Sequence, residues 1–387
     1  MLSQTRKSDS LRSIVQRNNR ASQAIPTNAL LRALVALVLA AVGSLVAIVG
    51  TAAASEHRAR APFGKVTPVA KTPVVTVTAG LALSPPKVVF LSPFVAATEG
   101  FFAKEHLRIK EEYMPTGLEV ELGTTAGAIN FGLSSGTDPI EAAAEGAPVR
   151  AIGSYGEKLD TVCIVPKTIK SAKTLIGKPV GTTGATGFAY TTLNACLVAG
   201  GVKITEVHTI TMTRAEFVSA IEDHKIYAAS FHADTGYVVL HTLPGSHVLY
   251  KEYESDPTWW YGAISTKLAY ARTHKSIVER FLAALALADR WMNTKKNTAK
   301  LITIGVKATG ESRAAVNYAV HFEIASHTWS TTLALVPKRI DFTTEELLHL
   351  KEITHKPTYT EIVTTTYLTG ALELLKEQGY ATGYPGK

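Results

Sequence analysis

Cysteine is scarce in this sequence, which has only two cysteines among 387 residues. Cys163 and Cys196 are far apart in the chain, and neither belongs to a Cys-x-x-Cys pair. A disulfide framework and thiol-based metal or redox motifs are therefore excluded. We favour the interpretation that both are small, buried, apolar side chains; a single bridge in an oxidising compartment is the alternative.

Cofactor motifs are also missing. The sequence contains no HExxH, no EF-hand loop and no spaced set of Cys and His residues, so we expect no metal site. The loop at residues 181–187, Gly-Thr-Thr-Gly-Ala-Thr-Gly, lacks the Gly-Lys-Ser/Thr ending of a P-loop and does not fit GxGxxG. We therefore expect no cofactor.

Charge is limited as well, with 19% charged residues against 46% hydrophobic ones. The formal net charge is +8, but six Lys or Arg residues and one Asp within residues 1–54 account for +5 and leave +3 for the rest. No stripe of Lys and Arg interleaved with aromatic residues appears. Nucleic-acid binding is therefore not expected.

One long hydrophobic run, at residues 33–54, contains no charged residue and follows a basic segment. It ends in Ala-Ala-Ala, a pattern that signal peptidase cuts, which predicts cleavage before Ser55. No cysteine stands there, so a lipoprotein anchor is not expected. The run is also long enough to span a bilayer, and an uncleaved signal anchor is the alternative. Both interpretations predict a periplasmic or extracytoplasmic body, which in the second case residues 33–54 anchor to the membrane.

Residues 55–86 are rich in Pro, Ala, Thr and Val, which predicts a linker. Beyond it, short apolar strands alternate with helical patterns in two similar sets, so we expect an α/β protein with two lobes on mainly parallel sheets. Strands are expected at residues 87–91, 108–113, 128–133, 149–155, 179–182, 207–212, 226–231 and 247–250. Helices are expected at residues 94–105, 118–126, 138–146, 188–198, 213–223, 276–293, 344–354 and 367–378. Ligands of such sheets lie at the carboxyl ends of strands.

Residues 132–136, Gly-Leu-Ser-Ser-Gly, fit the G-x-S-x-G nucleophile elbow of α/β-hydrolases. An exported serine hydrolase using Ser134, with Asp234 and His321 as partners, is therefore an alternative function. No oxyanion-hole segment of the HGGG type precedes Ser134, and Asp138 is suited to N-cap the next helix. We favour a glycine-flanked turn whose hydroxyl and N–H groups bind a polar ligand at a helix start.

The 181–187 loop offers the same combination of glycines and threonines in the second half of the chain. Two such loops facing each other across a cleft would form a binding site. His232 and Asp234 follow a predicted strand, so they either reach the cleft or form a capped turn. Trp259, Trp260 and Tyr261 are expected to pack in the core or the hinge; a ring stacked on the ligand is the alternative.

Five segments, in order, resemble solute-binding proteins of the nitrate/sulfonate/taurine type, a group that includes binders of thiamine-precursor pyrimidines. Residues 99–107, 127–132, 144–149, 174–181 and 217–229 are similar to the family's GlFkkeGL, GqiDfg, akGapv, sLkGKrvG and aLlsGkvDAa segments. The sequence departs from the pattern at Asn130, where Asp is usual, at His224, where Gly is common, and at residues 227–229, which lack an Asp. The cysteine-rich eukaryotic branch that makes the thiamine pyrimidine is not resembled.

The resemblance implies a type II periplasmic-binding-protein fold, an α/β fold with two doubly wound lobes around a cleft, and an ABC permease as membrane partner. Crossovers between the lobes are implied near residues 162–166 and 260–265. The expected organisation is 1–54 signal peptide or signal anchor, 55–86 linker, 87–160 first part of lobe 1, 161–258 lobe 2, and 259–387 second part of lobe 1 with C-terminal helices.

The resemblance also implies a function: capture of a small organic anion such as a sulfonate, taurine or nitrate for an ABC importer, by a monomer and without catalysis. The ligand residues carried over by position are Ser92, Pro93, Phe94, Ser134, Ser135, Thr137, Asp138, Tyr155, Thr182, Thr183, Thr186, His232 and Asp234. No arginine falls in these loops. A heteroaromatic, pyrimidine-like ligand stacked on Tyr155 or a tryptophan is the alternative.

Overall fold

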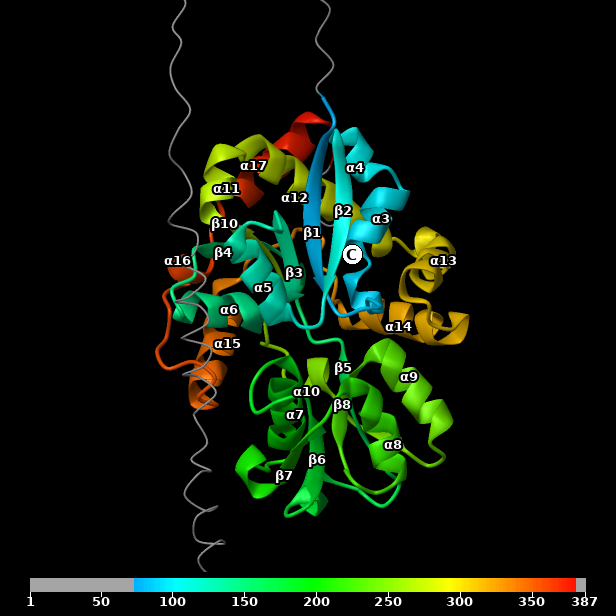
Figure 1. The fold of residues 1–387 in the computed structure, drawn as a ribbon. Helices are drawn as coiled ribbons and strands as arrows, with labels where there is room; N and C mark the ends of the chain where they lie inside the picture. Colours follow the sequence, from blue (N-terminus) through cyan, green and yellow to red (C-terminus); the bar gives the residue numbers. More distant parts are fainter. Residues whose placement is uncertain (1–72, 381–387) are drawn as a thin grey trace, which may run out of the picture. The chain divides into compact units, whose positions relative to one another are not determined.

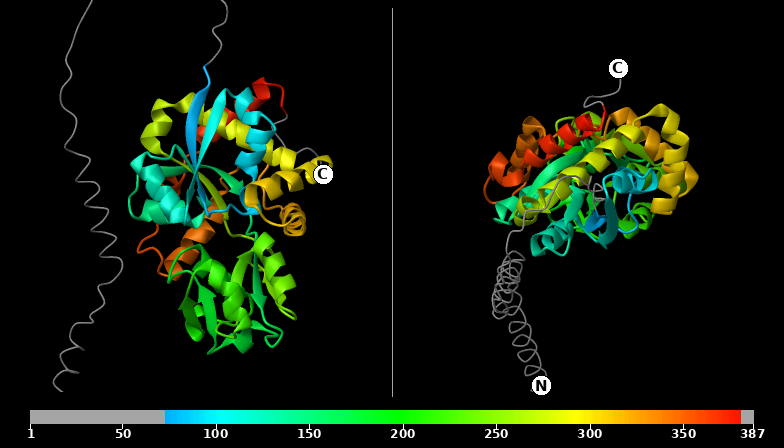
Figure 2. Two further views of the ribbon diagram at one scale, coloured as in Figure 1. Left: turned by 45° about the vertical axis from the view of Figure 1, so that its right-hand side comes forward. Right: turned by 90° about the horizontal axis from the view of Figure 1, so that it is seen from above.

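The computed structural model describes residues 73–380. The predicted leader and the larger part of the predicted linker lie outside the described residues. The described chain forms two lobes, each with its own β-sheets, and lobe 2 (green) lies below lobe 1 in Figure 1 and in the left view of Figure 2. The expected two-lobed α/β fold is confirmed.

Lobe 1 is built on a five-stranded sheet with the order β2-β1-β3-β10-β4. Its strands are β1 (Val75–Ala82), β2 (Leu107–Met114), β3 (Phe131–Ser135), β4 (Val149–Gly156) and β10 (Gly262–Lys267). β1 pairs in parallel with β2 and β3, whereas β10 is antiparallel to β3 and β4. The sheet is therefore mixed rather than mainly parallel, because β10, which follows lobe 2 in the chain, returns into its middle.

Two adjacent residues of β3 explain how helices cover both faces of this sheet. Phe131 stacks on Phe281 of α12 (Lys275–Met292), with ring centroids 3.8 Å apart. A Cβ on Gly132 would lie 2.8 Å from Val120 Cγ1 of α5 (Gly117–Ala126), so only glycine lets this helix approach so closely. Because successive strand residues point to opposite faces, α12 and α5 lie on opposite sides.

Lobe 2 contains a three-stranded antiparallel sheet, β8-β5-β9, and a parallel pair, β6-β7. The strands are β5 (Thr161–Val165), β6 (Pro179–Thr182), β7 (His208–Thr211), β8 (Ala229–His232) and β9 (His247–Lys251). The backbone N–H of Gly181 donates to the carbonyl of Ala228 at 2.8 Å, and that of Tyr227 donates to Pro179 at 2.8 Å. These bonds join the two sets of strands edge to edge.

Helices fill the remainder of both lobes. Those of lobe 1 are η1 (Val88–Phe90), α3 (Ser92–Thr98), α4 (Phe101–Lys104), α5, α6 (Thr137–Ala144), α11 (Leu268–Thr273), α12, η5 (Lys295–Asn297), α13 (Thr298–Thr309), α14 (Arg313–Ser326), α15 (Pro337–His349), α16 (Tyr359–Ile362) and α17 (Thr366–Glu377). Those of lobe 2 are η2 (Ala172–Leu175), α7 (Phe188–Ala199), η3 (Ile204–Glu206), η4 (Arg214–Glu216), α8 (Phe217–Glu222), α9 (Ala233–Thr242) and α10 (Glu252–Ser255). α14 of lobe 1 packs against α9 of lobe 2 (Figure 1).

Several local predictions are wrong. The helix expected at residues 344–354 is α15, which begins and ends earlier, at Pro337–His349. The linker does not extend to Pro86, because Val75–Ala82 forms the buried strand β1 and hydrogen-bonds to strands on both sides. The run at residues 87–91 is not a strand but the 3-10 turn η1, whose apolar residues are buried without a pairing partner. The helix expected at residues 94–105 is divided into α3 and α4 by Gly100, which has a left-handed φ of 74°.

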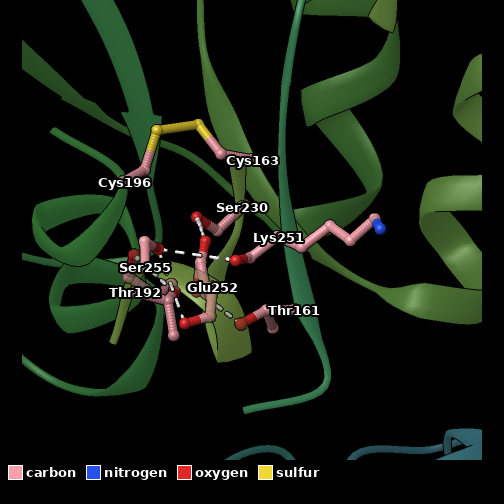
Figure 3. Close-up of a disulfide and its surroundings, with 9 residues drawn as sticks. Thr161, Cys163, Thr192, Cys196, Ser230, Lys251, Glu252 and Ser255 are labelled. Carbon is pink, nitrogen blue, oxygen red and sulfur yellow. Dashed lines mark hydrogen bonds between the residues drawn. A yellow bond between two sulfur atoms is a disulfide. The ribbon is translucent and has the colours of Figure 1, made fainter. Parts of the chain in front are cut away.

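The two cysteines form a disulfide, so the favoured interpretation of two unbridged side chains is wrong. Cys163 on β5 and Cys196 on α7 have Cα atoms 5.9 Å apart (Figure 3). Both residues are fully buried where α7 packs on the lobe 2 sheet. Packing of a helix on a sheet determines this proximity, and the spacing of cysteines in the sequence does not reveal it.

Candidate functional site

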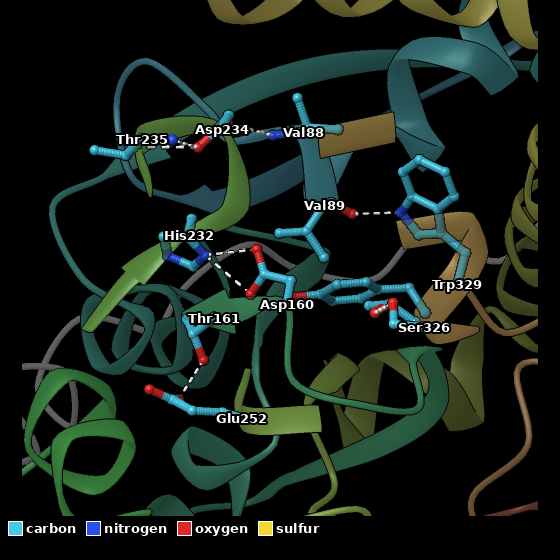
Figure 4. Close-up of polar contacts among 12 residues, drawn as sticks. Val88, Val89, Asp160, Thr161, His232, Asp234, Thr235, Glu252, Ser326 and Trp329 are labelled. Carbon is cyan, nitrogen blue, oxygen red and sulfur yellow. Dashed lines mark hydrogen bonds and ion pairs between the residues drawn. The ribbon is translucent and has the colours of Figure 1, made fainter. Parts of the chain in front are cut away.

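His232, the last residue of β8, lies beside the first crossover between the lobes. Its Nδ1 is 2.8 Å and 3.0 Å from the two carboxylate oxygens of Asp160, which precedes β5 (Figure 4). Both side chains are buried, with 4% and 1% exposure. The Nε2 of His232 is buried and has no hydrogen-bond partner among the described residues. Because the carboxylate occupies Nδ1, Nε2 is the ring atom available to a ligand.

Asp234 joins the lobes directly. From the first turn of α9 in lobe 2, its Oδ2 accepts a hydrogen bond from the backbone N–H of Val88 in lobe 1 at 2.9 Å (Figure 4). Its Oδ1 accepts from the backbone N–H of Thr235 at 2.6 Å. A buried carboxylate with two backbone donors is well satisfied, so Asp234 acts here as a contact between the lobes.

Aromatic rings form a continuous series from lobe 1 to lobe 2. Successive ring centroids lie 5.6 Å (Phe90 to Tyr155), 6.1 Å (Tyr155 to Tyr261), 5.5 Å (Tyr261 to Phe188) and 5.7 Å (Phe188 to His232) apart. Tyr155 is fully buried, and its hydroxyl donates to the carbonyl of Ser134 at 2.9 Å. The rings therefore make the boundary between the lobes apolar next to the hinge.

The loop between β3 and α6 satisfies most of its polar groups internally. Ser134 is fully buried and its Oγ donates to Glu121 at 2.7 Å. The hydroxyls of Ser135 and Thr137 bond to each other at 2.5 Å. Asp138 is not the N-cap as predicted: Gly136 holds that position, and Asp138 lies in the first turn of α6, where its Oδ2 accepts from the Ser135 N–H at 2.8 Å.

The glycine and threonine loop of lobe 2 is hydrogen-bonded to lobe 1 through the backbone of Gly187. The backbone N–H of Gly187, at the start of α7, donates to Glu352 Oε2 at 2.6 Å, and Glu352 belongs to the segment after α15. Thr182 is buried and its hydroxyl donates to the carbonyl of Gly184, whereas Thr183 and Thr186 are exposed. A helix N-terminus in lobe 2 thus receives a carboxylate from lobe 1, as expected for an anion-binding position.

Ser92, Pro93 and Phe94 lie in the first turn of α3. The Ser92 hydroxyl donates to Asp289 of α12, so it is engaged within lobe 1. Pro93 is buried at the helix start, and Phe94 packs against the core of the lobe. No hydrogen bond links these three residues to the other predicted site residues within residues 73–380.

Arg214 is a candidate ligand residue that the sequence pattern does not reveal. It lies in η4, directly after β7, where Thr213 and Glu216 form the expected capping box. Burial lowers the pKa of its guanidinium, and the nearby hydroxyl of Tyr261 and carboxylate of Asp160 raise it. These neighbours place Arg214 beside the hinge. The sequence at residues 213–216 is explained by the capping box of Thr213 and Glu216, so it gives no separate reason to select Arg214.

Four buried carboxylates on α5, on α6 and after α15 have raised pKa values. Burial raises the pKa of Glu121 to about 7, of Asp138 to about 8 and of Glu352 to about 7, and it raises that of Glu141 well above its ordinary value. Mutual repulsion adds to the increase for Asp138 and Glu141. None of the four belongs to an ion pair in the described part of the chain.

The residues of the alternative hydrolase triad are not assembled. Ser134 bonds to Glu121, Asp234 to Val88 and Thr235, and His321 is exposed on α14 with its Nδ1 at 2.8 Å from the Asn317 carbonyl. No hydrogen bond joins any two of the three in the described structure. The two glycines of the motif serve packing instead: Gly132 allows α5 to approach, and a Cβ on Gly136 would lie 2.4 Å from the Trp260 carbonyl.

Two crossover segments connect the lobes, one between β4 and β5 and the other between α10 and β10. Arg339 of α15 binds both, since its guanidinium donates to the carbonyls of Glu157 at 2.9 Å and Pro257 at 2.6 Å. Within residues 73–380 no helix is long and apolar enough to cross a bilayer. The same residues hold no group of three or more His, Cys, Asp or Glu side chains arranged for a metal ion.

This architecture is shared with several solved structures. The alkanesulfonate-binding protein SsuA of Xanthomonas axonopodis pv. citri, bound to MOPS, matches with a TM-score of 0.62 and 16% identity over 76% of this chain and 99% of its own. The periplasmic nitrate-binding protein NrtA of Synechocystis PCC 6803 matches with a TM-score of 0.62 and 12% identity over 78% of this chain and 89% of its own. A Candida albicans protein described as having the generic periplasmic binding protein fold matches with a TM-score of 0.58 and 11% identity, over 77% and 95% of the two chains.

The fold is therefore that of the periplasmic binding proteins. The model of the NMT1/THI5-like family matches residues 88–298, more than half of the sequence, and the chain belongs to this family. Curated proteins, in contrast, include none that matches. The resemblance inferred from the five sequence segments is thereby confirmed.

Proposed function

We propose that this protein is an extracytoplasmic solute-binding protein that captures a small organic acid between its lobes and delivers it to an ABC permease. The observation that carries the proposal is the buried Nε2 of His232, a polar atom beside the hinge with no partner among the described residues. Leaving such an atom without a hydrogen bond is costly, so a ligand in contact with it stabilises the closed lobes.

The electrostatics beside the hinge support an acid as the ligand. Arg214 and His232 bring two basic side chains to the same crossover. A sulfonate or carboxylate accepts several hydrogen bonds from such donors. Neighbours in the same fold, as their names state, bind alkanesulfonates and nitrate.

Lobe closure supplies the mechanism, and no bond chemistry is required. The carboxylate of Asp234 and that of Glu352 each bond to a backbone N–H of the opposite lobe, so closing the lobes forms both contacts at once. Opening would bend the segments at residues 157–160 and 256–261, and Arg339 holds these segments together. The closed form, with its ligand enclosed, is the form that a permease would recognise.

The expected location also agrees with the covalent structure. The Cys163–Cys196 disulfide is typical of proteins that fold in an oxidising compartment. The hydrophobic run at residues 33–54 would take the chain there, either as a cleaved signal peptide or as an anchor. We further propose that the protein acts as a monomer.

A heteroaromatic solute is the second candidate. The series of rings from Phe90 through Tyr155 and Tyr261 to Phe188 and His232 would stack on a pyrimidine-like ligand once the lobes separate. Thermal-shift measurements with both ligand classes distinguish the two candidates.

The test is a thermal-shift screen with alkanesulfonates, short carboxylic acids, nitrate and pyrimidines. A ligand at a hundred times its dissociation constant stabilises the folded state by about 2.7 kcal/mol, which shifts the melting temperature clearly. Arg214→Ala is expected to weaken binding by about tenfold or more, since a charged hydrogen bond is lost. Arg272→Ala, at an exposed arginine of α11, is the matched control and should leave affinity unchanged. If no compound of the panel raises the melting temperature, the proposed function is wrong.

A further inference from the structure

A groove of about 500 Å³ lies where α9 of lobe 2 packs against α14 of lobe 1 (Figure 1). We call it the α9–α14 groove. Lobe 2 contributes Tyr237, Lys251 and Tyr253 to its lining, and the other lining residues form a stripe along α14 from Ala314 to Ala325. None of the residues proposed for solute capture lines it. Its volume is within the range of small-molecule sites, so we ask which compound it fits.

Four aromatic rings from the two lobes converge in the α9–α14 groove. Tyr318 of α14 has its ring centroid 5.4 Å from that of Tyr237 in lobe 2 and 6.2 Å from that of Phe322. Phe322 in turn meets Tyr253 of lobe 2 edge to face at 5.2 Å. The three tyrosines are only partly buried, so part of each ring stays open to the groove. A further aromatic ring is the group that packs best among them.

The charges of the α9–α14 groove favour an anion. Its lining includes a lysine and a histidine but no Asp or Glu. The Nζ of Lys251 lies 5.9 Å from the ring centroid of Tyr253. Burial raises the pKa of the Tyr318 hydroxyl and Lys251 lowers it, which places the ammonium near this hydroxyl too. Nζ also pairs with Glu254 at 3.1 Å, but this pair is exposed and weak, and an ammonium has three N–H donors.

We propose that the α9–α14 groove is a second binding site, for a small aromatic acid whose ring packs among Tyr237, Tyr318 and Phe322 and whose carboxylate bonds to Lys251. An uncharged aromatic compound would lose the bond to the ammonium, and an aromatic cation would meet a like charge. Because both lobes line the groove, its occupant should stabilise the arrangement in which α9 and α14 pack together. The aromatic acid would therefore act as an effector of solute capture, and this consequence alone rests on the proposed function.

The test compares two compounds of the same shape, 2-naphthylacetate and 2-naphthylacetamide, which differ in charge. Calorimetric titration of the full-length protein is expected to show one site per chain for the acid. The acid should bind at least about fivefold more tightly than the amide, since a charge pair at a partly exposed site has this order of strength.

Lys251→Met is the informative variant, because it removes the charge and keeps an apolar stem at an exposed position. It should reduce the affinity for the acid to that for the amide and leave the amide unaffected. Lys178→Met is the matched control, since the Nζ of Lys178 lies 4.7 Å from the ring centroid of Tyr227, outside the groove. Tyr318→Leu should weaken acid and amide alike, by about fivefold, because a ring contact is lost.

The outcomes separate this site from the site proposed for solute capture. No binding of the acid, equal binding of acid and amide, or an unchanged affinity in Lys251→Met would overturn the second site. Binding that Arg214→Ala abolishes and Lys251→Met preserves would place the compound beside the hinge and overturn it as well.

The effect on solute capture has its own measurement. Saturating 2-naphthylacetate should tighten binding of the captured solute by about fivefold or more, as is typical of coupled sites. An unchanged solute affinity would overturn the role as effector. If no solute binds at all, the proposed function fails, whereas the Lys251→Met comparison still decides whether the α9–α14 groove binds an aromatic acid.

Discussion

Removal of the disulfide should destabilise the protein substantially. The bridge closes a loop with a sequence separation of 33 residues between β5 and α7. By the chain-entropy relation a loop of this length is worth about 4 kcal/mol at room temperature. Since domains typically unfold with about 5–15 kcal/mol, the Cys163→Ala/Cys196→Ala variant should lose a large part of its stability. In terms of populations, the folded-to-unfolded ratio should fall by roughly a thousandfold.

The assay is urea unfolding followed by circular dichroism, with and without a reducing agent. Reduction should lower the free energy of unfolding of the natural protein by the same amount as the double substitution, and it should not affect the variant. Comparing reduction with substitution separates the cross-link from the packing of the sulfur atoms. The reasoning is refuted if the difference is below about 1 kcal/mol, or if the denatured, unreduced protein shows two titratable thiols.

Three further predictions concern single groups. Burial raises the pKa of Glu252 to about 8, so the folded state binds more protons than the unfolded state between about pH 5 and 8, and the free energy of unfolding should decrease as the pH rises. In urea titrations across this range Glu252→Gln should lose less of its free energy of unfolding than the natural protein, and an equal dependence on pH would contradict the assignment. Gly136→Ala should destabilise by about 2 kcal/mol or more, because its Cβ would lie 2.4 Å from the Trp260 carbonyl; a melting temperature equal to that of the natural protein would contradict this packing. Ser134 is fully buried, so intact-mass measurements should show no labelling by a fluorophosphonate probe. Stoichiometric labelling of Ser134 would instead support the serine hydrolase alternative.

The fold was largely predictable because its strands follow local patterns. β2, β4 and β6 were expected within a few residues of their observed bounds, since apolar runs between turn residues mark buried strands. β1 was not predicted, because the prolines on both sides of it are typical of a linker. Residues 87–91 were misassigned because a buried 3-10 turn and a buried strand have the same apolar composition.

The candidate site was less predictable, because it depends on contacts between distant residues. His232 and Asp234 were identified because polar side chains at the end of a strand suggest a site. The approach of Glu352 to Gly187, across 165 residues, leaves no mark in the sequence. Arg214 was overlooked because its neighbours explain the local pattern as a capping box. The buried carboxylates could not be recognised either, since their burial depends on how the lobes pack.

The measurement that tests the central claim most directly is an isothermal titration of the protein with the solute that stabilises it best in the thermal-shift screen. Capture between two lobes predicts heat that saturates at one solute per chain, and a loss of this signal in Arg214→Ala. Heat that continues at constant rate after saturation would indicate turnover and contradict the account, as would saturable binding that Arg214→Ala leaves unchanged.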